Sequence, residues 1–162
     1  MNPTLHIICG LPGSGKSTLG RKLEKELSGF RFCPDEWIKA IFTENNWQFG
    51  SEEYQEQIEA LQLNLAKRLL QVNVNVIMEL STVDKDTRNR IRIEAQKVGA
   101  RVKLHFLELP VEELKRRIIQ RNLNEPTRTD TLRIEEDILD ELFNGYLKLL
   151  EVPTPDELAN FD

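Results

Sequence analysis

Apolar residues fall into short continuous runs that alternate with longer segments in which apolar positions recur every three or four residues. The continuous runs predict buried strands over residues 4–9, 30–33, 74–80 and 102–109. The recurring positions predict helices over residues 16–28, 34–42, 52–71, 84–98, 111–122 and 134–150. Strands that alternate with helices predict an α/β fold, in which a parallel sheet of four or five strands is covered on both faces and its crossovers are right-handed.

Two segments lie outside this alternation. Residues 124–131 contain a proline and have no periodicity, which indicates a loop. A fifth, edge strand would have to come from residues 152–162, VPTPDELANFD, but this stretch lacks an apolar run and is predicted to be an extended tail. No repeat, low-complexity tract or linker interrupts the 162 residues, so we expect residues 1–162 to form a single domain.

The overall charge limits the classes of partner. The net charge is −5, whereas a nucleic-acid-binding protein usually carries a basic face. Nucleic acid is therefore not the expected partner, and the local basic run KRRIIQR at 115–121 is the exception that needs an explanation. No apolar run is long enough to cross a bilayer, and the N-terminal MNPTLHIIC has no basic region before its apolar run, so we expect a cytoplasmic protein without membrane contact.

Cysteine usage and surface pattern add two default expectations. Cys9 and Cys33 fall at the ends of predicted strands, where they are interpreted as buried free thiols, and no cysteine or histidine cluster suggests zinc. No long apolar surface helix requires a partner, so a monomer is the default expectation.

A glycine-rich loop joins the first predicted strand to the first predicted helix. It fits the pattern G-x-x-x-x-G-K-[ST], whose backbone N–H groups surround the phosphates of ATP or GTP. The lysine of this pattern reaches the β- and γ-phosphates, and the hydroxyl after it ligates Mg²⁺, so the sequence predicts ATP and Mg²⁺ as cofactors. The residues are Gly10, Leu11, Pro12, Gly13, Ser14, Gly15, Lys16 and Ser17.

Glu79 closes the third predicted strand. If that strand neighbours the first, its carboxylate lies beside the loop and is a candidate to hold a metal-bound water near Ser17. The alternative is an ordinary surface carboxylate at a strand end.

Asp35 directly follows the second predicted strand, in the stretch CPDEW at 33–37. Ligands of parallel sheets bind beyond the carboxyl ends of the strands, so Asp35 is expected on the same edge as the phosphate loop. There it can accept a proton from a substrate hydroxyl, or orient that hydroxyl toward the γ-phosphate. The alternative is stabilisation of a helix N-terminus, a role that we also assign to Glu36.

Arginines after the fourth predicted strand are candidates for a lid over about residues 115–133. Arg117 and Arg121 are four residues apart and share one helix face, and Arg128 lies in the loop beyond. Phosphoryl transfer spreads negative charge over the γ-phosphoryl oxygens, which cations on a closing segment would stabilise. The alternative is a solvated basic face, which remains the interpretation for Lys115 and Arg116.

Aromatic and amide residues concentrate between residues 37 and 54, where part of them is expected in the core and part in a small-molecule pocket. Trp37 and Trp47 are the candidates to line that pocket. Lys85, Arg88 and Arg90 follow the third strand and are interpreted as a solvated helix face, with contact to an anionic substrate as the alternative.

Several stretches together resemble the small P-loop kinases of the zeta-toxin, chloramphenicol-phosphotransferase and polynucleotide-kinase group. They are ICGLPGSGKSTL, PDEW, a strand ending in an acidic residue, HFLELPVEELKRRIIQRN and the closing VPTPDEL. The most similar branch carries labels such as AAA-family ATPase or predicted kinase. The resemblance implies a P-loop NTPase three-layer sandwich, like that of nucleoside monophosphate kinases, with strand order 2-3-1-4-5.

The resemblance also implies roles for individual residues. Gly13 to Thr18 would bind ATP, Asp35 would be the catalytic aspartate, Arg117 and Arg121 would be lid arginines, and the loop near Pro153 would border the adenine. Relatives often carry aspartate where this chain has Glu79.

We therefore expect an ATP-dependent phosphotransferase that acts on a hydroxyl of a small molecule. The alternatives are an ATP-binding switch protein that acts on a protein partner, and a polynucleotide or nucleoside kinase. Antibiotic, sugar, nucleoside and nucleotide-sugar hydroxyls all remain open as acceptors.

Overall fold

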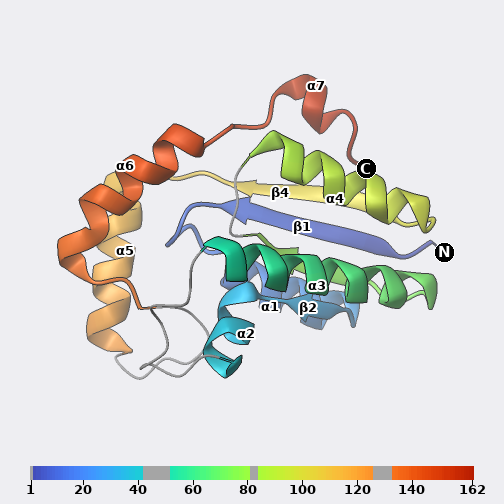
Figure 1. Ribbon diagram of the computed structural model, residues 1–162, viewed down its shortest axis with the longest axis horizontal. Helices are drawn as coiled ribbons and strands as arrows, with labels where there is room; N and C mark the ends of the chain where they lie inside the picture. The colour runs from blue at the N-terminus through green and yellow to red at the C-terminus, as the bar shows by residue number, and fades with distance from the viewer. Residues whose placement is uncertain (1, 42–51, 81–83, 126–132) are drawn as a thin grey trace.

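A computed structural model describes residues 2–41, 52–80, 84–125 and 133–162 of the chain (Figure 1). Strands and helices alternate as the sequence predicts, and the α/β fold is confirmed. The strands are β1 (Thr4–Gly10), β2 (Phe30–Phe32), β3 (Val76–Glu79) and β4 (Arg101–Leu107). The helices are α1 (Lys16–Leu27), α2 (Pro34–Ile41), α3 (Glu52–Gln71), α4 (Lys85–Lys97), α5 (Val111–Asn124), the 3₁₀ turn η2 (Glu136–Ile138), α6 (Leu139–Leu149) and α7 (Pro155–Leu158).

The strands form one parallel sheet in the order β2-β3-β1-β4, which confirms the expected order of the first four strands. Ile8 of β1 is in register with Glu79 of β3, so the carboxyl ends of these two strands meet at one edge. No fifth strand forms within the described residues. Instead, the backbone N–H of Asp162 donates to the carbonyl of Val102 (2.7 Å), and the Asp162 carboxylate accepts from the Val102 N–H (2.7 Å), beside the free edge of β4.

The main core lies between the sheet and helices α3 and α4, which cross in front of it in Figure 1. Alternate residues of β1 face these helices because successive side chains of a strand point to opposite faces. Trp37 is partly buried and packs against this core, with its ring centroid 5.9 Å from that of Phe32, and it is not part of the described cleft lining. The buried core residues include Leu5, Ile7, Cys9, Leu63, Ala66, Leu70, Ile91 and Ala95.

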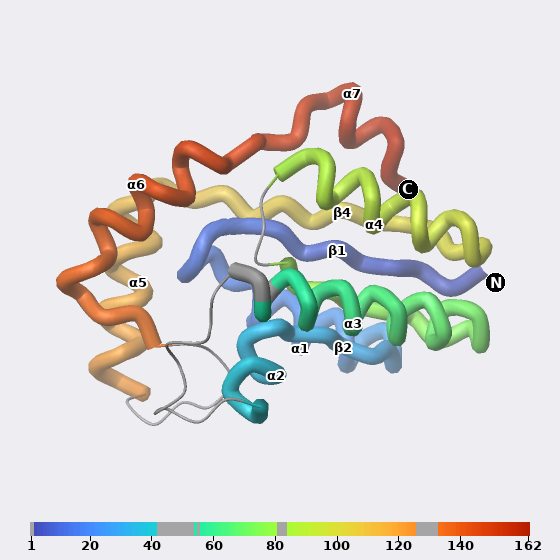
Figure 2. Tube along the Cα trace, in the orientation of Figure 1, coloured from blue at the N-terminus to red at the C-terminus, as the bar shows by residue number. Residues whose placement is uncertain are grey.

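A second, smaller core holds α5 and α6 together beyond the carboxyl ends of the strands. Figures 1 and 2 show this helix pair beyond the tip of the β1 arrow. Leu11, from the glycine-rich loop, is buried with Leu114, Ile118, Leu139 and Phe143 of these helices. Leu11 therefore connects the glycine-rich loop to α5 and α6. A cleft lies between this helix pair and the carboxyl ends of the strands.

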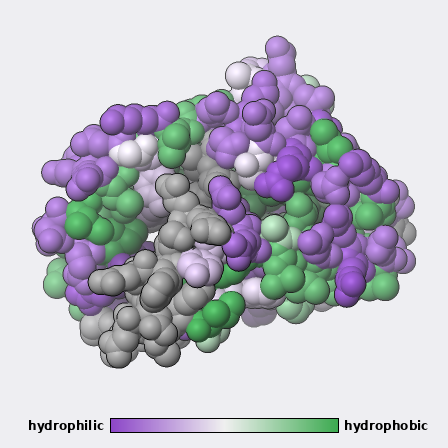
Figure 3. Space-filling model, viewed as in Figure 1, coloured by the Kyte–Doolittle hydropathy of each residue, from purple (hydrophilic) through white to green (hydrophobic). Residues whose placement is uncertain are grey.

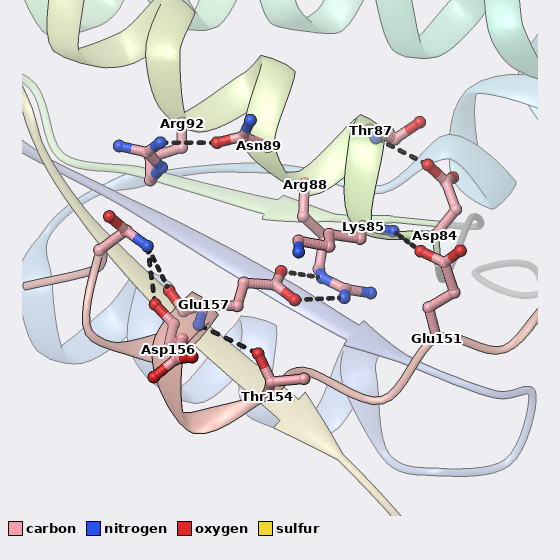
Figure 4. A network of polar contacts seen from close by, with 11 residues as sticks. Asp84, Lys85, Thr87, Arg88, Asn89, Arg92, Glu151, Thr154, Asp156 and Glu157 are labelled. Carbon is pink, nitrogen blue, oxygen red and sulfur yellow. Dashed lines mark hydrogen bonds and ion pairs between the residues drawn. The ribbon is translucent and has the colours of Figure 1, made fainter.

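The C-terminal segment contains a short helix, α7, where the sequence predicted an extended tail. Thr154 caps it, since its hydroxyl accepts from the Glu157 N–H (3.2 Å), and Pro155 occupies the first helical position. Figure 4 shows this segment against α4, where the Glu151 carboxylate accepts from the Lys85 N–H (2.6 Å).

Arg88 is fully buried under this segment, so both sequence interpretations of it, a solvated face and an anion-binding residue, are wrong. Its Nε and Nη2 donate to the two carboxylate oxygens of Glu157 at 2.7 and 2.9 Å (Figure 4). Burial lowers the pKa of Arg88, but the Glu157 carboxylate more than offsets this and the net shift is upward. A buried, paired charge thus attaches the end of the chain to the main core.

Among the residues coloured in Figure 3, hydrophilic ones predominate on this face, with several hydrophobic areas between them. Among the described helices, none has the length and apolar character needed to cross a membrane.

Two histidines meet on the sheet face opposite α3 and α4. His6 Nδ1 of β1 and His105 Nε2 of β4 are 3.0 Å apart, and their rings stack with centroids separated by 5.3 Å. Burial, the His105 ring and the nearby Lys103 and Arg101 lower the pKa of His6 to about 4, and burial with Lys103 also lowers the pKa of His105. Both rings are therefore neutral in the folded protein at neutral pH.

We expect the free energy of unfolding to decrease as pH falls from 6.5 toward 4. In this window the unfolded chain binds protons that the folded His6 does not, so stability rises with pH. The shift from 6.5 to about 4 corresponds to at most about 3 kcal/mol. Urea unfolding at several pH values measures the effect, and His6→Gln should flatten the pH dependence; an unchanged slope in this variant would contradict the assignment.

Candidate functional site

The glycine-rich loop begins where β1 ends and closes with the first residue of α1. Gly15 caps α1 in the left-handed region, at φ 101°, a conformation that glycine adopts without the strain of a side chain. The Ser14 N–H donates to the Leu11 carbonyl (3.1 Å), which tightens the turn. The first N–H groups of α1 have no partners within the helix and face the loop, so this turn can bind an anion.

Lys16 folds back over the loop. Its Nζ donates to the Gly10 carbonyl at 2.7 Å and to the Leu11 carbonyl at 3.4 Å. Burial lowers the pKa of Lys16, while the carboxylates of Asp35 and Glu79 act in the opposite direction. The lysine thus lies between two acids and the loop, where a phosphate can replace its carbonyl partners.

Glu79 is buried at the end of β3 and joins three elements. Its Oε2 accepts a hydrogen bond from the Ser17 hydroxyl of α1 (2.8 Å), and its Oε1 accepts one from the Arg31 guanidinium of β2. Arg31 also pairs with Glu36 of α2, which supports a structural role for Glu36. The carboxylate predicted to lie near Ser17 is therefore in direct contact with it.

Gly20 makes this contact sterically compatible with α1. A Cβ atom at this position would lie 2.6 Å from Glu79 Oε1 and 3.0 Å from Cδ of Arg31. The absence of a side chain at one turn of α1 lets the charged groups of β2 and β3 reach the loop.

The oxygens of Ser17 and Glu79 fit a magnesium ion that is bound together with a nucleotide. Mg²⁺ prefers oxygen ligands, keeps several waters and needs one or two protein groups besides phosphates. Among the described residues no cluster of three or more metal-ligating side chains occurs, so phosphate and water oxygens would have to complete the shell.

Asp35 lies in the first turn of α2, directly after β2, and lines the same cleft as the loop. Cys33 lies beside it, and burial raises the pKa of its thiol to about 11, so it is no nucleophile at neutral pH. Asp35, Glu79 and Lys16 all line this cleft, which agrees with the sequence prediction that they lie at one edge of the sheet.

The cleft has a volume of about 320 Å³, within the size range of small-molecule sites. One side consists of loop residues 12–18, together with Asp35, Glu79 and Leu80 from the ends of β2 and β3. The opposite side consists of Arg133, Ile134, Ile138, Leu142 and Tyr146, in and before η2 and α6.

Two of the predicted lid arginines, Arg117 and Arg121, are not part of the described cleft lining. Arg117 is on the exposed surface of α5, where its Nε donates to Glu113 (2.7 Å), and Arg121 lies one turn further along that helix. Arg128 falls outside the described residues, as does Trp47. The arginine that does line the cleft is Arg133, whose side chain is 51 % exposed and contacts Glu135 (2.7 Å).

Sequence reasoning missed Arg31, Arg133 and the apolar side of the cleft. A signal existed for Arg31, because a charged residue between two phenylalanines in a short strand needs a buried partner. Pro153, expected near the adenine, is not part of the described cleft lining.

Comparison with known families gives one match. A family model described as an AAA domain matches residues 5–142, which is most of the chain. A search of curated proteins gave no significant match.

Solved structures share the fold over 71–99 % of the chain. A chain of the Pnkp1/Rnl/Hen1 RNA repair complex is 24 % identical (TM-score 0.69), covering 99 % of this chain and 46 % of that one. A second structure of this complex is 28 % identical (TM-score 0.60), over 71 % of this chain and 38 % of that one. A sugar kinase from Janibacter sp. HTCC2649 is 19 % identical (TM-score 0.64), covering 97 % of this chain and 82 % of that one. The chain spans less than half the length of the RNA repair chains, and the likeness supports a P-loop kinase fold.

We expect Gly20→Ala to destabilise the protein by roughly 1–3 kcal/mol, because the new methyl group overlaps the Glu79 carboxylate. Gly145→Ala is the matched control. Gly145 also lies in a helix, but a Cβ there meets no atom within 4 Å, so alanine should be neutral or stabilise by up to about 1 kcal/mol. Urea unfolding measures both variants, and a Gly20→Ala protein as stable as Gly145→Ala would refute the close approach.

Proposed function

Since the chain belongs to the AAA-domain family, we propose that it is an ATP-dependent phosphotransferase that moves the γ-phosphoryl group of ATP to a hydroxyl of a small molecule. The observation that carries this proposal is the convergence of three features on one cleft. They are the phosphate-binding loop, the Ser17–Glu79 contact and the Asp35 carboxylate.

The loop residues Gly10 to Thr18 would hold the nucleotide. Backbone N–H groups of the loop would surround the β-phosphate, and Lys16 would exchange its carbonyl partners for β- and γ-phosphate oxygens. Ser17 would ligate Mg²⁺ directly and Glu79 through a bound water, and the ion would neutralise charge on the phosphates.

Asp35 is proposed as the group that receives the acceptor's proton. The hydroxyl oxygen attacks the γ-phosphorus, the bond between that phosphorus and the β–γ bridging oxygen breaks, and ADP leaves. The hydroxyl proton passes to the Asp35 carboxylate as the new O–P bond forms. Asp35 is well placed because it and the loop line the same cleft.

A cation opposite the loop would stabilise charge on the transferring group. Arg117, Arg121 and Arg128 are the candidates from the sequence, and the lining of the cleft adds Arg133. We place Arg133 first, because it lines the cleft together with the loop, whereas Arg117 is not part of the described cleft lining.

A second candidate function is phosphorylation of a polynucleotide end. The 28 % identity with a chain of an RNA repair complex favours it. The acidic net charge of −5 is unfavourable for binding a polyphosphate backbone, so we rank it below a small-molecule acceptor.

We expect Asp35→Asn to lower kcat for phosphoryl transfer by roughly 100-fold or more, because the amide cannot accept the proton. Transfer of labelled γ-phosphate from ATP with Mg²⁺ measures it, first across a panel of hydroxylated metabolites and antibiotics. Calorimetric titration with ATP reports nucleotide binding separately.

Asp86→Asn is the matched control, because Asp86 also lies in the first turn of a helix, α4, but away from the cleft. Both variants should lose a similar, small amount of stability through the helix dipole. Equal phosphoryl transfer by the two variants would reduce Asp35 to a helix-stabilising residue.

We expect Arg133→Ala to lower kcat by roughly 100-fold, the scale seen when one preorganised charge-stabilising donor is removed. Arg117→Ala serves as comparison, since this arginine is similarly exposed but lies outside the described cleft lining. The same labelled-phosphate assay is used. A larger loss of kcat in Arg117→Ala than in Arg133→Ala would assign the catalytic role to Arg117 instead. In that case α5 would have to move to bring Arg117 to the nucleotide.

A further inference from the structure

The side of the cleft opposite the loop carries an apolar stripe. Ile138, Leu142 and Tyr146 recur every four residues along η2 and α6, so they lie on one helix face, and all three line the cleft. Leu139 and Phe143 of the same helix are buried against α5, and the partly buried Tyr146 packs against that cluster as well as lining the cleft. Ile138 remains 46 % exposed although it lines the cleft.

Polar groups of α6 point away from the cleft. Asp140, Glu141 and Asn144 are exposed, Asp140 pairs with Lys115 of α5, and none of the three is part of the cleft lining. A polyhydroxylated acceptor would need hydrogen-bond partners for each hydroxyl that it buries. The stripe offers three aliphatic or aromatic side chains and a single phenol hydroxyl.

We propose that the acceptor presents its reactive hydroxyl on an apolar, ring-containing body, and that this body packs against the stripe of Ile138, Leu142 and Tyr146. The inference rests on the proposed phosphotransferase function and narrows its substrate class. It favours aryl alcohols and nucleosides over sugars and sugar acids, because apolar surface gains from leaving water while hydroxyls lose their hydration.

The position of the stripe favours the acceptor over the purine of ATP as its occupant. Lys16 and the Ser17–Glu79 contact mark the β- and γ-phosphate end of the loop. Asp35 and Leu80, which follow β2 and β3, line the same cleft as the stripe. A body held there would keep its hydroxyl near both the γ-phosphate and Asp35.

The experiment compares pairs of acceptors in which a ring in the second member replaces one hydroxyl of the first and the remaining hydroxyls are the same. Glycerol is paired with 3-phenylpropane-1,2-diol, and ribose with uridine, in the labelled γ-phosphate assay with the full chain, ATP and Mg²⁺. We expect kcat/KM to be on the order of tenfold or more higher for the ring-bearing member. The reason is that burying an apolar surface as large as one side chain strengthens binding by about this factor.

Two variants connect the preference to the stripe. Ile138→Ser should raise KM for the ring-bearing acceptor about tenfold and reduce the preference, whereas Leu147→Ser should change neither. Leu147 is an apt control because it is also 46 % exposed and lies on α6, but outside the cleft lining. Calorimetric titration of both variants with ATP measures the nucleotide affinity separately.

The outcomes separate this inference from the function on which it rests. Equal or better transfer to glycerol and ribose would overturn the inference and leave the phosphotransferase intact. Weakening of ATP binding by Ile138→Ser as large as the rise in acceptor KM would assign the stripe to the purine and also overturn it. ATP binding without transfer to any compound of either type would count against the proposed function, and the inference would fail with it.

Discussion

The buried carboxylate of Glu79 connects the sheet to the cleft through its contacts with Arg31 and Ser17. Glu79 is 3 % exposed, and such a charge is tolerated only with a full set of partners, because its loss of hydration costs several kcal/mol. Those partners come from β2, through Arg31, and from α1, through Ser17. The strand order that places β3 between β2 and β1 is therefore also what orients the Ser17 hydroxyl. Sheet topology and ligand-binding geometry depend on the same ion pair.

The two sides of the cleft divide the chemistry between them. The sheet edge contributes fixed charges, which are held by backbone and by one another, and it offers the groups that phosphate and magnesium require. The helix pair contributes apolar surface and one arginine, and it is fastened to the loop through Leu11. Activity is thus expected to respond to changes on the sheet edge and at Arg133, and acceptor choice to changes in the apolar stripe of η2 and α6. The overall charge of −5 is compatible with this division, because the cations of the cleft are local.

Local signals in the sequence were sufficient for much of this arrangement. The apolar runs predicted the four strands, and the glycine-rich pattern predicted the turn that Gly15 makes. Asp35 could be placed because parallel strands end at a common edge. The pairing of Arg31 with Glu79 and of Arg88 with Glu157 could not be predicted, since in each pair the partners lie far apart along the chain.

Helix periodicity also left one ambiguity unresolved. Apolar residues occupy two faces of α6, and spacing alone does not say which face is buried against α5 and which is open to the cleft.

The helix α7 was missed for a different reason. Its signal, a threonine cap followed by proline, is only a few residues long and has no apolar period to support it.

The attachment of the chain's end to α4 has a consequence for the order in which the protein is made. Arg88 leaves the ribosome 69 residues before Glu157, the carboxylate that neutralises it. At about 5–20 residues per second, the guanidinium waits roughly 3–14 seconds for its partner. During that interval α4 cannot settle on the sheet without burying an uncompensated charge. Completion of the main core is therefore expected to await synthesis of the segment that carries Glu157, and a translational pause before this segment would prolong the exposure of the apolar face of β1 and β4.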